Sequence, residues 1–174
     1  MSQVHTCIAL LRAVNVGGTG KLPMATLVAM CEALGFTRVR TYIASGNVVF
    51  DARVSPEKAR AALEARLADH AGKPVGVVMR SPAEMAATLQ ANPFPNDAPN
   101  RVVAIFFEQA PEPSCLQAVR GRRDEQLALV GREIWVSYGD GMADSKLVIP
   151  AARSGTARNL NTVAKLAAIA AGKA

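Results

Sequence analysis

The chain has 174 residues, of which half are hydrophobic and a fifth are charged, and its formal net charge is +6 at pH 7. This composition is typical of a globular protein, no apolar run approaches the roughly 20 residues of a membrane span, and no signal-peptide pattern opens the chain. We therefore expect a cytoplasmic protein with no membrane partner, and the three widely spaced cysteines, which form no CxxC pair, agree with that expectation.

The first eighty residues alternate between strand and helix patterns. Apolar β-branched runs predict strands, and periodic apolar stripes bounded by proline and glycine predict helices. The predicted elements are a strand over 4–11, a helix over 23–34, strands over 39–44 and 47–50, a helix over 56–70 and a strand over 75–80. This is the β-α-β-β-α-β order of the split βαβ, or ferredoxin-like, arrangement.

The rest of the chain repeats this order in part. A capping box at Ser81 opens a helix to about Ala91, and the segment 92–100, with three prolines and three asparagines, is predicted to be a linker. The elements predicted after it are a strand over 101–107, a short helix over 111–120, a hairpin of 125–130 and 133–138, a short edge strand over 146–150 and a last helix capped by Asn159 or Asn161. We therefore predict an α+β fold of two ferredoxin-like halves with antiparallel sheets: a half over 1–91, the linker over 92–100, and a second, incomplete half over 101–174.

Three polar blocks stand where this chain turns, over 10–24, 41–50 and 154–166. The first, with NVGGTGKL, does not fit the phosphate loop G-x-x-x-x-G-K-[ST], because Asn15 occupies the first glycine position and Leu22 the hydroxyl position. Two interpretations of it stay open. The amides of Gly17 and Gly18 form an anion nest, assisted by charged bonds from Arg12 and Lys21, or the glycines serve only a tight turn.

The other two blocks have the same two kinds of interpretation. Ser45 and Asn47 flank a turn glycine, and either close the turn with a side-chain bond or offer donors to the ligand of Arg12. Asn159 is a natural helix cap. Arg158 is poorly placed at the positive end of a helix, so it either reaches a carboxylate or awaits an anion.

Groups for other chemistry are scarce. Neither His5 nor His70 adjoins a Ser or Cys nucleophile motif, and no metal-ligand spacing is present, so we assign no catalytic residue and expect no metal and no cofactor. The basic-Gly-aromatic signature of RNA-binding domains with this strand order is also absent. Whether the protein is an enzyme stays open at this point.

Several stretches, taken together, carry a family resemblance. They are LLRAVNVGG at 10–18, KLPM at the start of the first helix, LGFTRVRTYIASGNVVF at 34–50, NPF at 92–94 and TARNLNTVAKL at 156–166. In these the chain resembles the bacterial family catalogued as domain of unknown function 1697. The resemblance implies two ferredoxin-like halves and no assigned activity. Its characteristic residues fall here on Arg12, Asn15, Gly17, Gly18, Ser45, Gly46, Asn47, Arg158, Asn159 and Thr162. Leu160 stands where members usually carry an aromatic residue, so no stacking role is expected there.

These observations favour one function and leave two alternatives. The favoured hypothesis is recognition of a small ligand bearing a phosphate or carboxylate, with Arg12 and Arg158 facing one cleft. Its predicted contacts are Arg12, Asn15, Gly17, Gly18, Lys21, Ser45, Asn47, Arg158 and Asn159. The first alternative is a nucleic-acid-binding module, favoured by the positive charge but by no motif. The second is an interaction protein whose polar blocks are purely structural.

Overall fold

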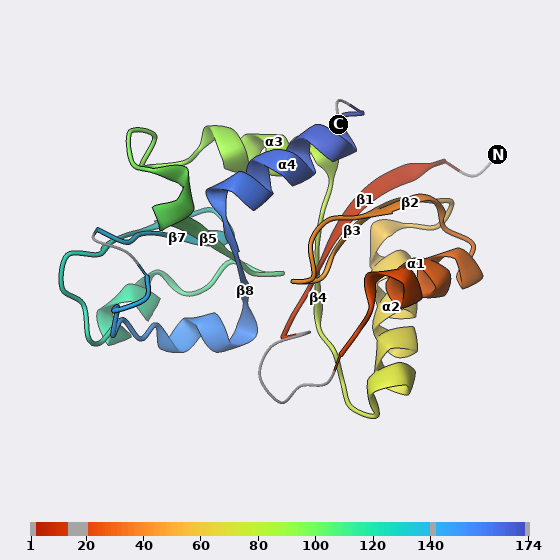
Figure 1. Ribbon diagram of the computed structural model, residues 1–174, viewed down its shortest axis with the longest axis horizontal. Coiled ribbons are helices and arrows are strands. Elements are labelled where there is room, and N and C mark those ends of the chain that lie inside the picture. Colours follow the sequence, from red (N-terminus) through yellow and green to blue (C-terminus); the bar gives the residue numbers. More distant parts are fainter. Residues whose placement is uncertain (1–2, 14–20, 140–141, 173–174) are drawn as a thin grey trace. The chain divides into compact units, whose positions relative to one another are not determined.

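The computed structural model describes residues 3–13, 21–139 and 142–172 (Figure 1). It contains two four-stranded antiparallel sheets together with helices, which confirms the predicted α+β class with antiparallel sheets. The chain divides into two compact units. Unit 1 comprises Met1–Met85 and Leu166–Ala174, and unit 2 comprises Ala86–Lys165. The division therefore falls inside two helices, α3 (Pro82–Gln90) and α4 (Leu160–Ala170).

Unit 1 has the predicted β-α-β-β-α-β order. Its elements are β1 (His5–Leu11), α1 (Met24–Ala33), β2 (Thr37–Thr41), β3 (Asn47–Ala52), α2 (Pro56–Ala71) and β4 (Val77–Arg80). The strands lie in the order β2-β3-β1-β4. The helix α2 begins at a Ser55 cap, whose Oγ accepts from the amide of Lys58, and it ends at Gly72 in the left-handed conformation.

Both faces of the central strands of unit 1 are buried. Cys7, Ala9 and Leu11 of β1 belong to the core that α1 and α2 share with this sheet. The alternating residues Ile8 and Leu10, on the opposite face, are also fully buried. Continuous apolar runs of this kind are typical of strands covered on both sides. Polar groups in unit 1 are therefore most accessible at strand ends and along the edge strand β2.

Unit 2 builds a second sheet with the same topology. Its strands are β5 (Val102–Phe106), β6 (Gln126–Val130), β7 (Glu133–Ser137) and β8 (Thr156–Asn159), in the order β6-β7-β5-β8. Three 3₁₀ segments lie in it: η1 (Pro99–Arg101), η2 (Pro113–Ala118) and η3 (Pro150–Ser154). Matched in sequence order, its strands follow the order found in unit 1. This agreement supports a duplication of one supersecondary unit.

Unit 2 also corrects three sequence-based expectations. The predicted helix over 111–120 is the 3₁₀ segment η2, which suits a run interrupted by two prolines. The predicted edge strand over 146–150 is absent, and Val148 makes only an isolated bridge with Arg120. The fourth strand is instead β8, inside the third polar block. Its register buries Thr156 and Arg158 while Ala157 is exposed, so an apolar pattern does not reveal it.

Candidate functional site

Two of the three polar blocks meet at the end of β1. The register pairs Leu10 with Asn47, and the amide of Leu11 donates to the carbonyl of Gly46 at 2.8 Å. The turn over 42–47 therefore lies beside the residue that precedes Arg12. Of the first block, it is thus the described residues 10–12 that lie next to this turn.

Arg12 is fixed at this place by Gly76, the residue before β4. Its amide donates to the carbonyl of Gly76 at 2.9 Å. Its side chain lies over the same residue, because a Cβ added to Gly76 would come within 3.0 Å of Arg12 Cδ and 3.1 Å of a terminal guanidinium nitrogen. Glycine at this position therefore lets a half-buried arginine cross the backbone. We call Arg12, the turn over 42–47 and Gly76 the β1 edge.

The side chains of the turn are committed to closing it. Asn47 is fully buried, and its Nδ2 donates to the carbonyl of Tyr42 at 2.8 Å and to Ser45 Oγ at 2.9 Å. Gly46 has a φ of +89°, as expected for a turn glycine. These bonds are the ones expected if Ser45 and Asn47 serve to close the turn. Asn47 shapes the site and does not face solvent.

Two residues with side chains have strained backbone at the β1 edge. Ala13 follows Arg12 directly and has a φ of +55°. Ile43, in the turn, has a φ of +52° and is 48% exposed. A β-branched residue is a genuine outlier in the left-handed region, and such strain concentrates at binding sites and switches.

The remaining residues of the first block flank α1. Lys21 is exposed, in the segment that leads into this helix. The helix itself begins after Pro23 with no side-chain cap and no acidic residue in its first turn, so its positive end is not offset locally. Asn15, Gly17 and Gly18 lie outside the described residues.

The third block lies in unit 2. Asn159 Oδ1 accepts from the amide of Thr162 at 2.9 Å, which confirms the predicted cap of α4. Arg158 is the third residue of β8. One terminal nitrogen of its guanidinium donates to Thr156 Oγ1 at 2.6 Å and to the carbonyl of Ala157 at 2.9 Å. Burial lowers its pKa to about 10. That Arg12 and Arg158 face one cleft stays a prediction, since they belong to different units.

Sequence reasoning missed a counterpart of Arg158 in unit 1. Arg80 ends β4, is 2% exposed, and donates to the carbonyl of the preceding residue, as Arg158 does. Each arginine also directly precedes a helix cap, Ser81 for α3 and Asn159 for α4. The available signal was an Arg followed by a capping residue at the same place in both halves. The recurrence indicates that this pairing belongs to the repeated fold and is not peculiar to one block.

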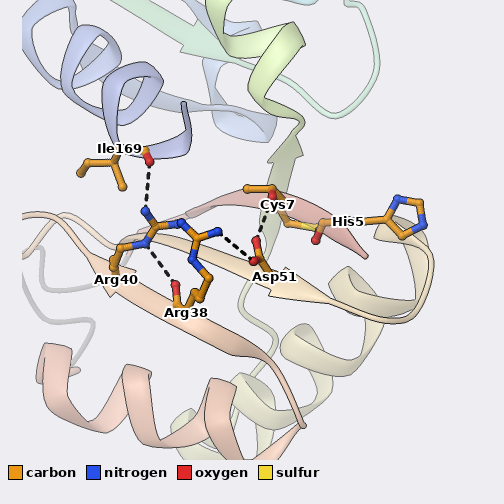
Figure 2. A network of polar contacts seen from close by, with 7 residues as sticks. His5, Cys7, Arg38, Arg40, Asp51 and Ile169 are labelled. Atoms are coloured by element: carbon orange, nitrogen blue, oxygen red, sulfur yellow. Dashed lines mark hydrogen bonds and ion pairs between the residues drawn. The ribbon is translucent and has the colours of Figure 1, made fainter. Parts of the chain in front are cut away.

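A second polar network, on β2, is structural (Figure 2). A bulge in β2 holds Arg38 at a φ of +51°, and its guanidinium lies 3.4 Å from Asp51, which also accepts from Thr6 Oγ1 at 2.8 Å. Arg40 donates to the carbonyl of Arg38 and, at 3.0 Å, to that of Ile169 in the last turn of α4. A cation at this end of a helix complements its dipole. The network thus attaches the end of α4 to β2.

Nucleophiles and metal ligands are not assembled in the described part of the chain. No group of three or more His, Cys, Asp or Glu there could hold a metal ion, and no helix there is long and apolar enough to cross a bilayer. Burial raises the pKa of Cys7 to about 11 and that of Cys31 to about 12, which makes both thiols poor nucleophiles.

A family model described as Protein of unknown function (DUF1697) matches residues 4–135, which include β1, the turn over 42–47 and Gly76. The chain belongs to this family. A search of curated proteins gave no match. Among solved structures, the conserved bacterial protein SP0830 from Streptococcus pneumoniae is 23% identical, with a TM-score of 0.78 over 97% of this chain and 99% of that one. This likeness establishes a shared fold over nearly the whole DUF1697 chain.

Proposed function

We propose that unit 1 binds a small ligand bearing a phosphate or carboxylate group at the β1 edge. The supporting observation is the convergence of Arg12 with the turn over 42–47, from two separate blocks, at the end of one strand. Arg12 recognises the anion by charge-assisted bonds, and Lys21 adds positive charge. Asn47 holds the turn in shape from behind, through its bonds to Tyr42 and Ser45.

The environment of Arg12 supports this function over a purely structural role. The backbone of Gly76 holds the arginine, and positive φ angles occur at Ala13, directly after Arg12, and at Ile43 in the turn. Strain of this kind costs about 1–3 kcal/mol per residue and is retained where the surroundings require it. We infer that the edge is preorganised for a ligand.

Titration of the full chain with inorganic phosphate, pyrophosphate and acetate, followed by NMR or calorimetry, tests the proposal. Arg12→Gln should weaken binding about tenfold or more, because a bond to a charged group is lost. Gly76→Ala keeps every charge but crowds the arginine side chain, and should weaken binding several-fold. The control is Arg53→Gln, which changes an exposed arginine of the same unit. Absence of binding to the wild type, or equal binding by Arg12→Gln, would overturn the proposal.

One observation favours nucleic acid as a second candidate partner. Arg120, Arg122 and Arg123 are exposed, and the bridge between Arg120 and Val148 brings exposed Lys146 close, with its carbonyl against Gly121. Four exposed basic residues thus lie on two backbone segments of unit 2 that are close to each other. Base stacking on a sheet face is disfavoured, because β5 and β7 are buried throughout.

A salt titration separates this candidate from the first. Binding of a polyanion through these four side chains should weaken steeply with salt, by up to roughly 0.9 in log K per log salt for each phosphate contact. Arg123→Glu with Lys146→Glu should flatten that slope, whereas Lys58→Glu with Lys73→Glu in unit 1 is the matched reversal of two exposed charges. If both pairs act alike, only net charge matters and this surface has no special role.

A further inference from the structure

Unit 2 has a pocket of about 310 Å³ at one end of its sheet, where β7 ends and β5 and β6 begin. Its volume lies at the lower end of the range for small-molecule sites, roughly 300–1,000 Å³. The residues that matter in its lining are Asp97, Arg101, Asp124, Gln126, Tyr138 and Gly139. None of them belongs to the β1 edge, so this is a separate site.

The pocket holds opposite charges that do not pair with each other. Asp97 Oδ2 accepts from Ser137 Oγ at 2.5 Å, and Arg101 donates to the carbonyl of Gly139 at 2.7 Å. Among the described residues, these are the only side-chain bonds of Asp97 and Arg101. A carboxylate has about four acceptor positions and a guanidinium has five N–H donors. Both groups therefore keep most of their hydrogen-bonding capacity for another partner.

The wall of the pocket is closely fitted around a second carboxylate. Asp124 lies so near Gly139 that a Cβ at position 139 would overlap with its Oδ2. A Cβ at this position would therefore displace the Asp124 side chain. The carbonyl of the same Gly139 holds Arg101, and the amide of Tyr138 donates to the carbonyl of Arg101 at 2.8 Å. The segment 137–139 therefore holds Arg101 through its backbone and Asp97 through the Ser137 side chain, and it lies close to Asp124.

This arrangement selects against ligands of a single charge. An anion would meet the carboxylates of Asp97 and Asp124, and a cation would meet the guanidinium of Arg101. We propose that the pocket binds a small zwitterion, an α-amino acid in chemical class, with its ammonium group at Asp97 and its carboxylate at Arg101. Asp124 adds a second acceptor, and Gln126 and Tyr138 supply neutral hydrogen-bonding groups to the rest of the molecule.

The test uses the full chain and a pool of free L-amino acids, screened by ligand-observed NMR. The best binder is then titrated beside its decarboxylated amine and its deaminated acid, and each should bind at least about tenfold more weakly than the parent. Asp97→Asn and Arg101→Gln should each weaken binding of the parent by a similar factor. Their matched controls, Asp144→Asn and Arg53→Gln, change exposed charges outside the pocket lining and should bind as the wild type does.

Two further variants make the outcome decisive. Gly139→Ala keeps all charges but displaces Asp124, so it should abolish binding while thermal unfolding shows that the chain still folds. Arg12→Gln, at the β1 edge, should leave amino-acid binding unchanged, which separates this site from the function proposed for unit 1. Failure of every amino acid to bind the wild type, or equal binding of the single-charge analogues, would overturn the assignment.

Discussion

At the scale of single residues, the polar blocks contain side chains of two kinds. Asn47 and Asn159 have their amide groups engaged by the local backbone, as turn closure and helix cap. Arg12 is different, because its amide donates to the carbonyl of Gly76 and its side chain lies over the same residue. Residue type alone did not separate these roles.

Replacing Asn47 by Ala should be strongly destabilising. The change removes two hydrogen bonds in a fully buried place and leaves the carbonyl of Tyr42 without that donor, which costs about 1–3 kcal/mol. Urea unfolding measures this loss. Asn161→Ala, at an exposed position of α4, is the control and should stay within about 0.5 kcal/mol of the wild type. Equal midpoints for the two variants would contradict the structural role of Asn47.

The buried thiols predict a loss of stability at alkaline pH. In the folded chain, burial raises the pKa of Cys7 to about 11 and that of Cys31 to about 12, from an ordinary thiol value of 9.0. In the unfolded chain the two thiols ionise at a lower pH than in the folded chain. The stability that they contribute is therefore fully present below about pH 9, and it is lost as the pH rises through the pKa values of the folded chain. The free energy of unfolding, measured from about pH 8 to about pH 11, should fall less steeply in Cys7→Ala with Cys31→Ala. An unchanged slope would contradict this assignment.

At the scale of elements, side chains from distant segments hold the strand ends and loops in place. Arg40 in the edge strand β2 bonds the last turn of α4 across 129 positions of sequence (Figure 2). In unit 2, Glu125 is 3% exposed and accepts from Ser145 Oγ at 2.5 Å and from the amide of Arg123 at 2.6 Å. These bonds connect the loop before β6 to the segment that contains Ser145.

Arg40→Ala should loosen the end of α4. Loss of one bond to a helix carbonyl, of about 1 kcal/mol, should speed amide exchange over 168–172 about fivefold and leave β3 protected. Hydrogen exchange followed by mass spectrometry resolves this segment. Arg53→Ala serves as the control, since Arg53 is exposed and makes no side-chain bond among the described residues. Uniform acceleration across unit 1 would point to global destabilisation instead.

Ser145→Ala should change how the free energy of unfolding depends on pH in the acid range. The hydrogen bond from Ser145 is the main cause of the lowered pKa of Glu125, followed by its backbone bonds. A carboxyl group whose pKa is lower in the folded chain than in the unfolded chain stabilises the fold at pH values above its unfolded pKa. This stabilisation is lost as the pH falls through the folded pKa. The variant should therefore be less stable near neutral pH and should show a flatter loss toward acid. Ser114→Ala, at an exposed position, should reproduce the wild-type curve.

At the scale of the whole molecule, both boundaries between the two units fall within helices, one in α3 and one in α4. Unit 1 takes its last residues, Leu166–Ala174, from the other end of the sequence. Leu166 is fully buried and Ile169 nearly so. The linker predicted at 92–100 marks a change of composition, whereas the contacts assign α3 to both units.

A fragment covering residues 1–91 tests how far the first half folds by itself. It lacks Leu166–Ala174, so Arg40 loses the carbonyl of Ile169 and unit 1 loses buried apolar surface. We expect faster amide exchange in β2 of the fragment than in β2 of the full chain, and a lower thermal midpoint. Equal protection in both would support independent halves with limits at 1–91 and 101–174.

The sequence by itself determined the elements whose signals are local. Capping residues, glycine stops and apolar periods predicted β1, α1, α2 and the hairpins, because these signals depend on neighbouring residues in the chain. Only the tertiary structure decided what depends on distant partners. The strand β8 forms because it pairs with β5 along an antiparallel ladder of hydrogen bonds. The small size of Gly76 is important because the Arg12 side chain lies over this residue. The pocket beside Gly139 likewise assembles Asp97, Arg101 and Asp124 from separate segments, whose spacing along the chain bears no relation to their proximity in space.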